Sequence, residues 1–561
     1  MASTFPRVAK MPRDTEQQAP ADFQEHLARL EARGLVTRIE RAIDKDSELH
    51  PLARWQFQGG LPEEERRAFL FTNVTDARGG KYDIPVAVGA LAASPEIYAA
   101  GLGVPVSEIG EVWVRAMAKP IPAERVESAP CQEVVLSGDD LTKPGGGLAR
   151  LPVPISTPGF DSAPYLTATL VVTKDPESGV RNMGTYRGQL KAQDRLGVRM
   201  ASRLGGAGGY LHWLKYQARG EKMPVAIVIG CAPAVLFTGP QKLPIDEDEL
   251  HVAGGLMGRP VRAVRCKTVD LEVPADAEIV IEGEIATDYL EPEGPFGESH
   301  GHVALEDFNM SMQVTAITMK KKPVFVSIVS QVTPSESSVL KKVAYEPLFL
   351  EHLKKVLNVK GIKRVVMHEP LTNIRKVIFL QFDRSAPQSE IWRGLQGAAT
   401  LQAQCGKICI AVSEDIEPNN ADAIFWSLAY RTSITQDVVM TPYRSAGHGP
   451  KSGGGKGDGT LLIDATLKSD MPPLALPAEP FMTRAKAIWE ELGLPRLTPQ
   501  PPWYGYDLGD WDDLWTTFAE RAVAGDWEEN GRHTEGRRRG GMKPETPVRN
   551  IESRGGQADK K

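Results

Sequence analysis

The sequence has few cysteines and no long apolar run. Its 561 residues include five cysteines, an odd number at irregular spacings, which excludes a disulfide framework and indicates a reducing compartment. No stretch approaches the roughly 18 consecutive apolar residues that a membrane span requires. Residues 1–14 lack the apolar core of a secretory signal. We therefore expect a cytoplasmic protein with no membrane partner. Cys405 and Cys409, which have no other metal ligands near them in sequence, are expected to be free and buried.

An excess of basic residues is also absent. The chain has 66 Lys and Arg against 72 Asp and Glu, a net charge of -6, so no nucleic-acid partner is indicated. A basic cluster, Arg537 to Arg539, lies in the polar stretch after Gly525. We interpret residues 526–561 as a disordered tail, with an RNA-contacting arm as the sharper alternative.

Nucleotide-binding fingerprints are missing. The glycine-rich stretch Ser452–Gly459 has Pro450 at the first glycine position of a phosphate-binding loop, and Gly457 follows Lys456 where Ser or Thr is required. No dinucleotide-binding fingerprint occurs either. These absences exclude a nucleotide hydrolase of the usual kind.

The pattern of apolar residues changes twice along the chain. An amphipathic helix at 22–34, with Asp22 as its N-cap, opens a mixed α/β domain at 1–130. Segments rich in Val, Ile and Thr predict a barrel of strands at 131–331. Alternating helix and strand signals predict a second α/β domain at 332–475, followed by a helical extension at 476–525. The strands expected in the middle domain are 167–173, 225–230, 278–282, 313–319 and 324–329.

The densest group of polar side chains lies at Glu291–His302. Its glycines and prolines prevent a regular helix, and it carries three carboxylates and two imidazoles. Paired carboxylates on such a loop can act as acid and base, because burial and mutual repulsion separate their pKa values. An acidic surface loop is the alternative interpretation.

Two weaker patterns precede this loop. Arg181–Arg187 follows a predicted strand and could direct amide and guanidinium groups at an anion, although it could equally be a simple turn. Glycines at 205, 206, 208 and 209 follow Arg203 and would let the backbone approach a phosphate.

Several segments, in order, resemble one known family. They are 30–40 near the start, 271–280, the stretch Glu293–Glu298, which is the most specific, and Lys456 with Ile463–Thr466 near the end. Over residues 22–466 the chain resembles the UbiD family of decarboxylases. The resemblance implies an N-terminal α/β domain, a central flavin-reductase-like split β-barrel and a C-terminal α/β domain.

The resemblance also implies a set of site residues. The family's catalytic Glu, Arg and Glu correspond to Arg187, Glu293 and Glu298, where Glu298 donates a proton and Arg187 holds the substrate carboxylate. Asn182 and Glu249 correspond to ligands of the cofactor phosphate and of a divalent metal, Mn²⁺ or Mg²⁺, with K⁺ as a further candidate ion. Lys456 corresponds to a cofactor-binding lysine.

One position departs from the family. Arg203 stands where a metal-binding His is usual, which puts the divalent metal in doubt. The guanidinium of Arg203 could instead bind the phosphate directly, because it is permanently charged and can donate two parallel hydrogen bonds. His300 and His302 are weaker candidates for contact with a polar substituent of the substrate, and an exposed or supporting position is the alternative for both.

The function that the resemblance implies is reversible, non-oxidative decarboxylation through a covalent adduct between substrate and prenylated FMN. The substrate would be an aromatic or α,β-unsaturated acid, either free or as an aryl acyl-CoA thioester such as phthaloyl-CoA. A flavin prenyltransferase would supply the cofactor, and the protein would form a homo-oligomer, from a dimer to a hexamer. The alternatives are a split-barrel flavin oxidoreductase and a non-catalytic assembly subunit on the same fold.

Overall fold

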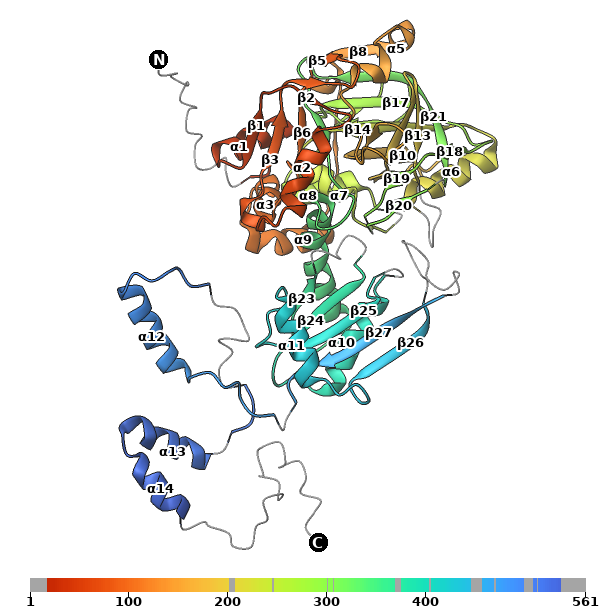
Figure 1. Ribbon diagram of the computed structural model, residues 1–561. Helices are drawn as coiled ribbons and strands as arrows, with labels where there is room; N and C mark the ends of the chain where they lie inside the picture. Colours follow the sequence, from red (N-terminus) through yellow and green to blue (C-terminus); the bar gives the residue numbers. More distant parts are fainter. Residues whose placement is uncertain are drawn as a thin grey trace, which may run out of the picture.

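The structure is a computed structural model of the chain (Figure 1). It describes residues 18–200, 207–244, 247–299, 301–305, 307–368, 375–402, 405–444, 457–468, 471–498, 508–511 and 513–535. Mixed α/β content and several separate sheets are found, as expected from the sequence.

The first part of the chain builds a four-stranded sheet in the order β1-β3-β6-β22. The side chain of Asp22 accepts a hydrogen bond from the backbone N–H of Glu25, so the predicted N-cap of the first helix is confirmed. The strands are β1 (Val36–Ile39), β3 (Ala68–Phe71), β6 (Val86–Val88) and β22 (Phe325–Ser327), and the helices are α1 (Phe23–Ala32), α2 (Leu49–Gln58), α3 (Pro95–Leu102) and α4 (Ile109–Ala118). A small sheet beside them holds β2 (Ile43–Asp44), β4 (Val74–Thr75) and β5 (Lys81–Tyr82).

Strand β22 has a partner that the sequence did not indicate. The segment 324–329 was expected among the strands of the middle part, but β22 pairs in parallel with β6, more than 200 residues earlier. All three residues of β22 are buried, and Phe325 and Val326 belong to the large hydrophobic core. One continuous hydrophobic core then extends from Phe23 to Ala344.

The middle part contains a ten-stranded antiparallel sheet. Its main order is β11-β10-β14-β17-β21-β13-β12-β9, and β8 and β18 also pair with the long strand β21. The strands are β8 (Val134–Ser137), β9 (Tyr165–Leu166), β10 (Thr169–Lys174), β11 (Arg181–Gly184), β12 (Gly188–Ala192), β13 (Arg195–Val198), β14 (Met223–Ile229), β17 (Ile279–Ile285), β18 (Glu291–Glu293) and β21 (Asp307–Met319). The predicted strands at 167–173, 225–230, 278–282 and 313–319 are thus confirmed.

Short elements surround this sheet. They are the helices α5 (Asp139–Thr142), α6 (Gly208–Arg219), α7 (Pro233–Thr238) and α8 (Glu249–Met257), the three-stranded sheet β16 (Glu272–Pro274), β15 (Arg262–Arg265) and β7 (Glu124–Val126), and the pair β19 (Phe296–Gly297) and β20 (Val303–Ala304).

The next part of the chain forms a five-stranded sheet with helices on both faces. The strand order is β23-β24-β25-β27-β26, and separate hydrophobic clusters cover its two faces. The elements are α9 (Glu336–Glu351), β23 (Ile362–Met367), β24 (Val377–Phe382), α10 (Gln388–Thr400), β25 (Ile408–Ser413), α11 (Ala421–Arg431), β26 (Val438–Arg444) and β27 (Asp458–Ala465). The predicted alternation of helix and strand is confirmed here. Cys405 and Cys409 are free and buried, as predicted, and the other three cysteines are free and buried as well.

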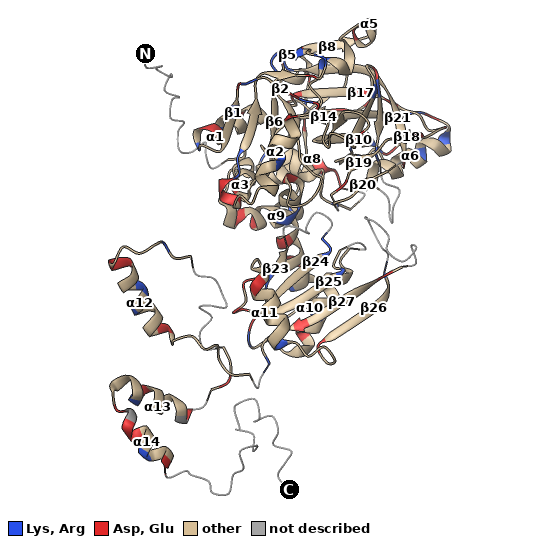
Figure 2. Ribbon diagram, in the orientation of Figure 1, with Lys and Arg blue, Asp and Glu red and all other residues tan. Residues whose placement is uncertain are grey.

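Three helices follow and stand apart from the body in Figure 1: α12 (Glu479–Glu491), α13 (Asp513–Ala524) and α14 (Trp527–Glu535). Residues 527–535, where the sequence predicted the start of a disordered tail, are helical. This segment is ordered because it packs on α13: the His533 ring lies edge-on against Phe518, and Asn530 donates a hydrogen bond to the carbonyl of Phe518. Charged residues of both signs occur throughout the ribbon (Figure 2).

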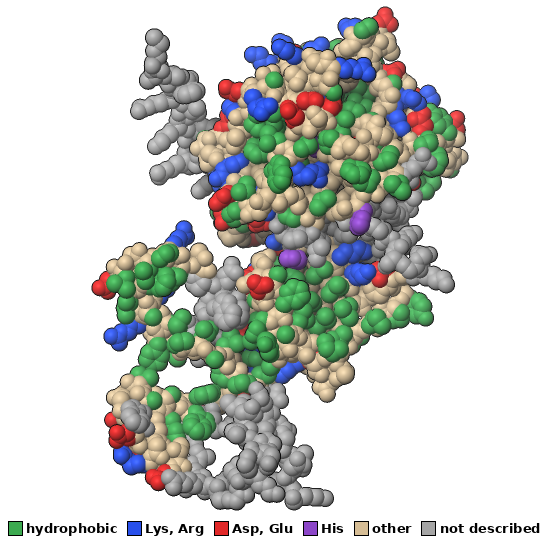
Figure 3. Space-filling model, viewed as in Figure 1, with side chains coloured by type: hydrophobic (Ala, Val, Ile, Leu, Met, Phe, Trp, Pro, Cys, Tyr) green, Lys and Arg blue, Asp and Glu red, His purple; other side chains and the backbone are tan. Residues whose placement is uncertain are grey.

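The C-terminal parts expose apolar side chains, visible as green areas in Figure 3. On β26, Met440 is 76% and Tyr443 is 96% exposed, and Leu492 at the end of α12 is 66% exposed. Apolar surface of this kind is typical of contacts with another chain. No helix within the described residues combines the length and apolar character needed to cross a membrane.

Candidate active site

One guanidinium binds two carboxylates beside the ten-stranded sheet. Arg187 lies in the short segment between β11 and β12, Glu293 ends β18, and Glu298 directly follows β19. Arg187 donates from Nε to Oε1 of Glu293 and from Nη2 to Oε2, both at 2.7 Å, and from Nη1 to Oε1 of Glu298. The structure therefore brings together the three residues proposed as catalytic from the sequence.

These charges are largely removed from water. The exposed fractions of the side chains are 14% for Arg187, 1% for Glu293 and 13% for Glu298. Burial acts to lower the pKa of Arg187, but the hydrogen bonds and charges of the two carboxylates outweigh it and raise that pKa above its ordinary value. Arg187 is therefore a permanent cation at the centre of the site.

Two aromatic rings form an apolar wall behind Arg187. The guanidinium carbon lies 4.5 Å from the ring centre of Phe296, which is 4.3 Å from that of Tyr165. Burial, with a further effect from the charge of Glu293, raises the pKa of Tyr165, so its hydroxyl stays protonated and donates to the carbonyl of Gly294. Neither ring is a candidate site residue on the sequence alone, although Phe296 lies inside the predicted loop.

Gly294 and Gly297 permit close packing beneath the carboxylates. A Cβ at Gly294 would lie 1.8 Å from Oγ of Ser162, so any side chain there would displace the loop. The N–H of Gly297 donates to Oδ1 of Asp161 at 3.1 Å, and this contact fixes the peptide next to Glu298. Asp161 comes from a loop rich in Pro and Gly before β9, and that composition was the available signal for it.

The backbone of Glu298 is also held on both sides. Its N–H donates to the carbonyl of His302 at 3.0 Å, and its carbonyl accepts from the N–H of Val332 at 3.4 Å. The His302 side chain is exposed. The role of His302 in substrate contact stays a prediction. His300, Arg203 and Lys456, the other candidates from the sequence, lie outside the described residues.

The helix α9 approaches the same site. Burial lowers the pKa of Lys341 to about 7, with the nearby charge of Arg375 in the same direction and the charges of Cys405 and Glu298 in the opposite one. Lys341 therefore lies within electrostatic reach of Glu298. Nothing in the sequence distinguished it from the other lysines of the helix.

Glu249, at the start of α8, contacts the backbone of β11 next to Asn182. Oε2 of Glu249 accepts a hydrogen bond from the N–H of Met183, the residue after Asn182, at 2.8 Å. The first turn of α6 lies against Asn182, and a Cβ at Gly208 would be only 1.9 Å from Oδ1 of Asn182. The exposed N–H groups of a helix N-terminus favour a bound phosphate.

This pair has the chemistry of a cation and phosphate site. Glu249 is 6% exposed and forms no ion pair with any described residue, and burial raises its pKa to about 8 against the opposing effect of backbone N–H donors. A divalent cation would neutralise this carboxylate, and the Asn and Glu oxygens are hard ligands that suit Mg²⁺ or Mn²⁺. Within the described ranges, no cluster of three His, Cys, Asp or Glu side chains could hold a metal. The pair therefore fits a metal only when phosphate oxygens complete its ligands.

Replacing Arg187 with Met should destabilise the protein strongly, because it leaves buried carboxylates without a cation. Breaking a buried ion pair in this way costs about 3–5 kcal/mol. Arg195→Met is the matched control, since the Arg195–Glu291 pair is 40% and 21% exposed and exposed pairs contribute at most about 1 kcal/mol. Urea unfolding of the cofactor-free proteins measures both effects, and equal losses would contradict the buried-pair account.

Three family models match this chain in order. They are the N-terminal domain, the Rift-related domain and the C-terminal domain of 3-octaprenyl-4-hydroxybenzoate carboxy-lyase, at residues 27–117, 124–332 and 338–465. The fold and the site thus define a carboxy-lyase. The chain belongs to the UbiD family, and the resemblance noted from the sequence is confirmed.

Related proteins match over nearly their whole length. An uncharacterized protein of Synechocystis sp., sll0936, is 28% identical over 530 residues, which cover 87% of this chain and 99% of that protein. An evolved dimeric form of the UbiD-class enzyme HmfF from Pelotomaculum thermopropionicum, solved with prFMN, is 29% identical with a TM-score of 0.69, covering 82% of this chain and 97% of that one. Vanillic acid decarboxylase of Sedimentibacter hydroxybenzoicus, at 23% identity and a TM-score of 0.70, covers 85% of this chain and 100% of its own and shows a shared fold.

Proposed function

We propose that this protein is a prenylated-FMN-dependent decarboxylase that acts reversibly on an aromatic or α,β-unsaturated carboxylic acid. The observation that carries the proposal is the single guanidinium of Arg187 bound to both Glu293 and Glu298, in a chain of the UbiD family. The family assignment favours this function over the flavin oxidoreductase and the non-catalytic subunit considered from the sequence.

The energetics explain why a cofactor is needed. Loss of CO₂ from an sp² carbon leaves an unstabilised carbanion, and enzymes typically lower reaction barriers by about 8–23 kcal/mol. One oriented hydrogen-bond donor contributes only about 3–4 kcal/mol, so three polar side chains are insufficient. Bound prenylated FMN would supply the electron sink. In support, the HmfF enzyme, 29% identical to this chain, was solved with prFMN.

We assign the cofactor contacts to the edge formed by β11, α6 and α8. Asn182 and Glu249 would hold the flavin phosphate together with a divalent cation, for the reasons of charge and burial given above. Arg203 and Lys456 are further candidates for this phosphate on the sequence alone, and K⁺ remains a further candidate ion. The ten-stranded sheet would correspond to the split barrel expected from the sequence.

The three charged residues would have separate tasks. Arg187 orients the substrate carboxylate, and the bidentate bond from Glu293 fixes the plane of the guanidinium. Protonated Glu298 transfers its proton to the carbon that has lost CO₂, and it regains a proton from solvent before the next turnover. The apolar wall of Phe296 and Tyr165 limits the entry of water to this position. The reaction therefore converts one acid into CO₂ and a C–H bond with no net oxidation.

The family assignment also supports the expected partners. A small aromatic acid, free or as an aryl acyl-CoA thioester, would be the substrate, and a flavin prenyltransferase would supply the cofactor. The exposed apolar surfaces of β26 and α12 agree with a homo-oligomer, and an evolved form of HmfF is dimeric.

A panel of acids tests the proposal. Protein that contains prenylated flavin by mass spectrometry is incubated with benzoic, phenolic, heteroaromatic and cinnamic acids and with phthaloyl-CoA, and released CO₂ is measured. We expect at least one acid to lose CO₂, and the corresponding product to exchange its new C–H hydrogen with D₂O, because each step is reversible. Loaded protein that catalyses neither reaction on any member would contradict the proposed function.

A further inference from the structure

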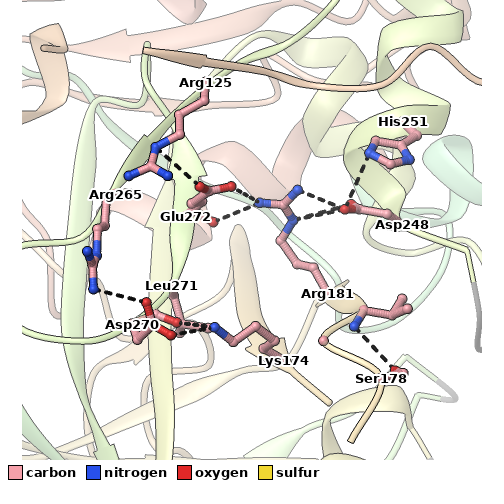
Figure 4. A pocket seen from close by; sticks show the side chains of 12 residues that line it. Arg125, Lys174, Ser178, Arg181, Asp248, His251, Arg265, Asp270, Leu271 and Glu272 are labelled. Atoms are coloured by element: carbon pink, nitrogen blue, oxygen red, sulfur yellow. Dashed lines mark hydrogen bonds and ion pairs between the residues drawn. The ribbon is translucent and has the colours of Figure 1, made fainter. Parts of the chain in front are cut away.

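An ion pair lies directly beside the proposed cofactor ligands. Arg181 precedes Asn182, and Asp248 precedes Glu249. Arg181 donates from Nη2 to Oδ2 of Asp248 at 2.7 Å, and from Nε to Oδ2 at 3.1 Å and to Oδ1 at 3.3 Å (Figure 4). Their side chains are 13% and 11% exposed. This pair therefore joins β11 to the start of α8 one residue before each proposed ligand.

Further contacts fix both partners. Asp248 is the N-cap of α8 and accepts a hydrogen bond from the N–H of Leu250 at 2.9 Å. Nη1 of Arg181 donates to the carbonyl of Glu272 at 3.3 Å, which ties β11 to β16 as well. The bond from Met183 N–H to Glu249 is a second link between β11 and α8. Two adjacent residues at the start of α8, Asp248 and Glu249, thus bind β11.

Because side chains alternate along a strand, Arg181 and Asn182 lie on opposite faces of β11 and can have different roles. Neighbouring residues of β11 point to opposite faces, so the guanidinium of Arg181 lies on the face away from Asn182. It lines a polar cavity of about 470 Å³ together with Lys174, Asp270 and His251. Arg181 is therefore placed to act through its neighbours, without touching a phosphate at Asn182.

We propose that Arg181 and Asp248 are positioning residues that hold Asn182 and Glu249 side by side for the flavin phosphate and its divalent cation. The inference rests on the proposed function, because it assumes that these two residues bind the cofactor. A forked pair of low exposure restrains the distance between strand and helix better than a single contact does. Without this ion pair, Asn182 and Glu249 would keep their ligand oxygens, but the distance between the two residues would no longer be fixed.

The test measures binding of FMN to purified cofactor-free protein, with and without Mn²⁺, by flavin fluorescence. Asp248→Asn is the main variant, because Asn is also a good N-cap residue but carries no charge for Arg181. We expect it to weaken FMN binding in the presence of Mn²⁺ by about tenfold. Arg181 keeps a second carboxylate, Oε2 of Glu272 at 3.5 Å from Nη1, so the melting temperature should change little. Arg181→Lys should lose somewhat less affinity, since an ammonium keeps the charge without the fork.

A matched control lines the same cavity. Asp270 pairs with Lys174, away from the proposed ligands, and the two side chains are 71% and 34% exposed. Asp270→Asn should leave FMN affinity unchanged. The double variant Arg181→Gln/Asp248→Asn should bind FMN no more weakly than either substitution alone. Both substitutions remove the same ion pair, so their effects do not add.

Two further variants separate this inference from the proposed function. If Asn182→Ala and Glu249→Gln do not weaken FMN binding, the proposed cofactor site is wrong and the positioning role is wrong with it. If they do weaken it while Asp248→Asn binds as the wild type does, the positioning role alone is overturned. Equal losses of FMN affinity in Asp248→Asn and Asp270→Asn would also overturn the positioning role. They would show that the loss of one negative charge anywhere in this cavity weakens binding.

Discussion

Replacing Glu298 with Gln should lower turnover by about two to four orders of magnitude, the usual contribution of a positioned acid or base. The amide oxygen can still accept the hydrogen bond from Nη1 of Arg187, so the geometry of the site is preserved. The amide cannot give a proton to the carbon that loses CO₂. Steady-state rates of CO₂ release from an acid identified in the panel measure the effect.

The same variant should keep its flavin. Glu298 lies in the loop after β19, whereas the proposed phosphate ligands lie on β11 and α8, so the absorption spectrum of the bound cofactor should not change. Glu291→Gln is the matched control, since Glu291 lies two residues before Glu293 and pairs with Arg195 outside the cluster. It should retain activity within about twofold, as expected for a surface pair worth under ~1 kcal/mol. Full activity of Glu298→Gln would remove this residue from the proposed chemistry, and activity lost only together with flavin would give it a structural role.

Local patterns predicted the regular elements well. Asp22 and the apolar spacing after it defined α1, and the β-branched runs defined most strands of the large sheet, because both signals act over a few residues. The partner of β22 could not be predicted, since the pairing of β22 with β6 depends on how distant parts of the chain pack. The helix α14 was missed because its sequence is polar and its order depends on contacts with Phe518 and its neighbours.

In the site, too, local sequence predicted some features, whereas others depend on contacts between distant parts of the chain. The glycines and carboxylates of Glu293–Glu298 marked the loop from composition alone, but only the family resemblance connected them with Arg187, more than 100 residues earlier. Supporting residues had only weak signals: Asp161 lies in a loop rich in Pro and Gly, and Arg181 lies in a segment considered for anion binding and not for support. Their role comes from hydrogen bonds to the backbone and to neighbouring elements, which depend on the folded arrangement.

Activity should depend entirely on a prenylated cofactor. Ordinary FMN can occupy a related site, as the HmfF structure with FMN shows for that enzyme, so flavin binding alone does not distinguish the two cofactors. The polar residues of the site stabilise charge and move a proton but provide no electron sink, so a cofactor has to carry the step. The proposed covalent bond to the substrate would distinguish the two flavins, because it would form on the prenylated one. Protein produced without a flavin prenyltransferase should therefore bind flavin and fail to turn over.

The decisive measurement compares two preparations of the wild-type protein, expressed with and without a flavin prenyltransferase, in the same CO₂-release assay. The mass of the extracted cofactor is determined for each preparation. The account predicts that only the preparation containing prenylated FMN releases CO₂, with a rate that increases in proportion to its occupancy. Equal rates from the two preparations would contradict it.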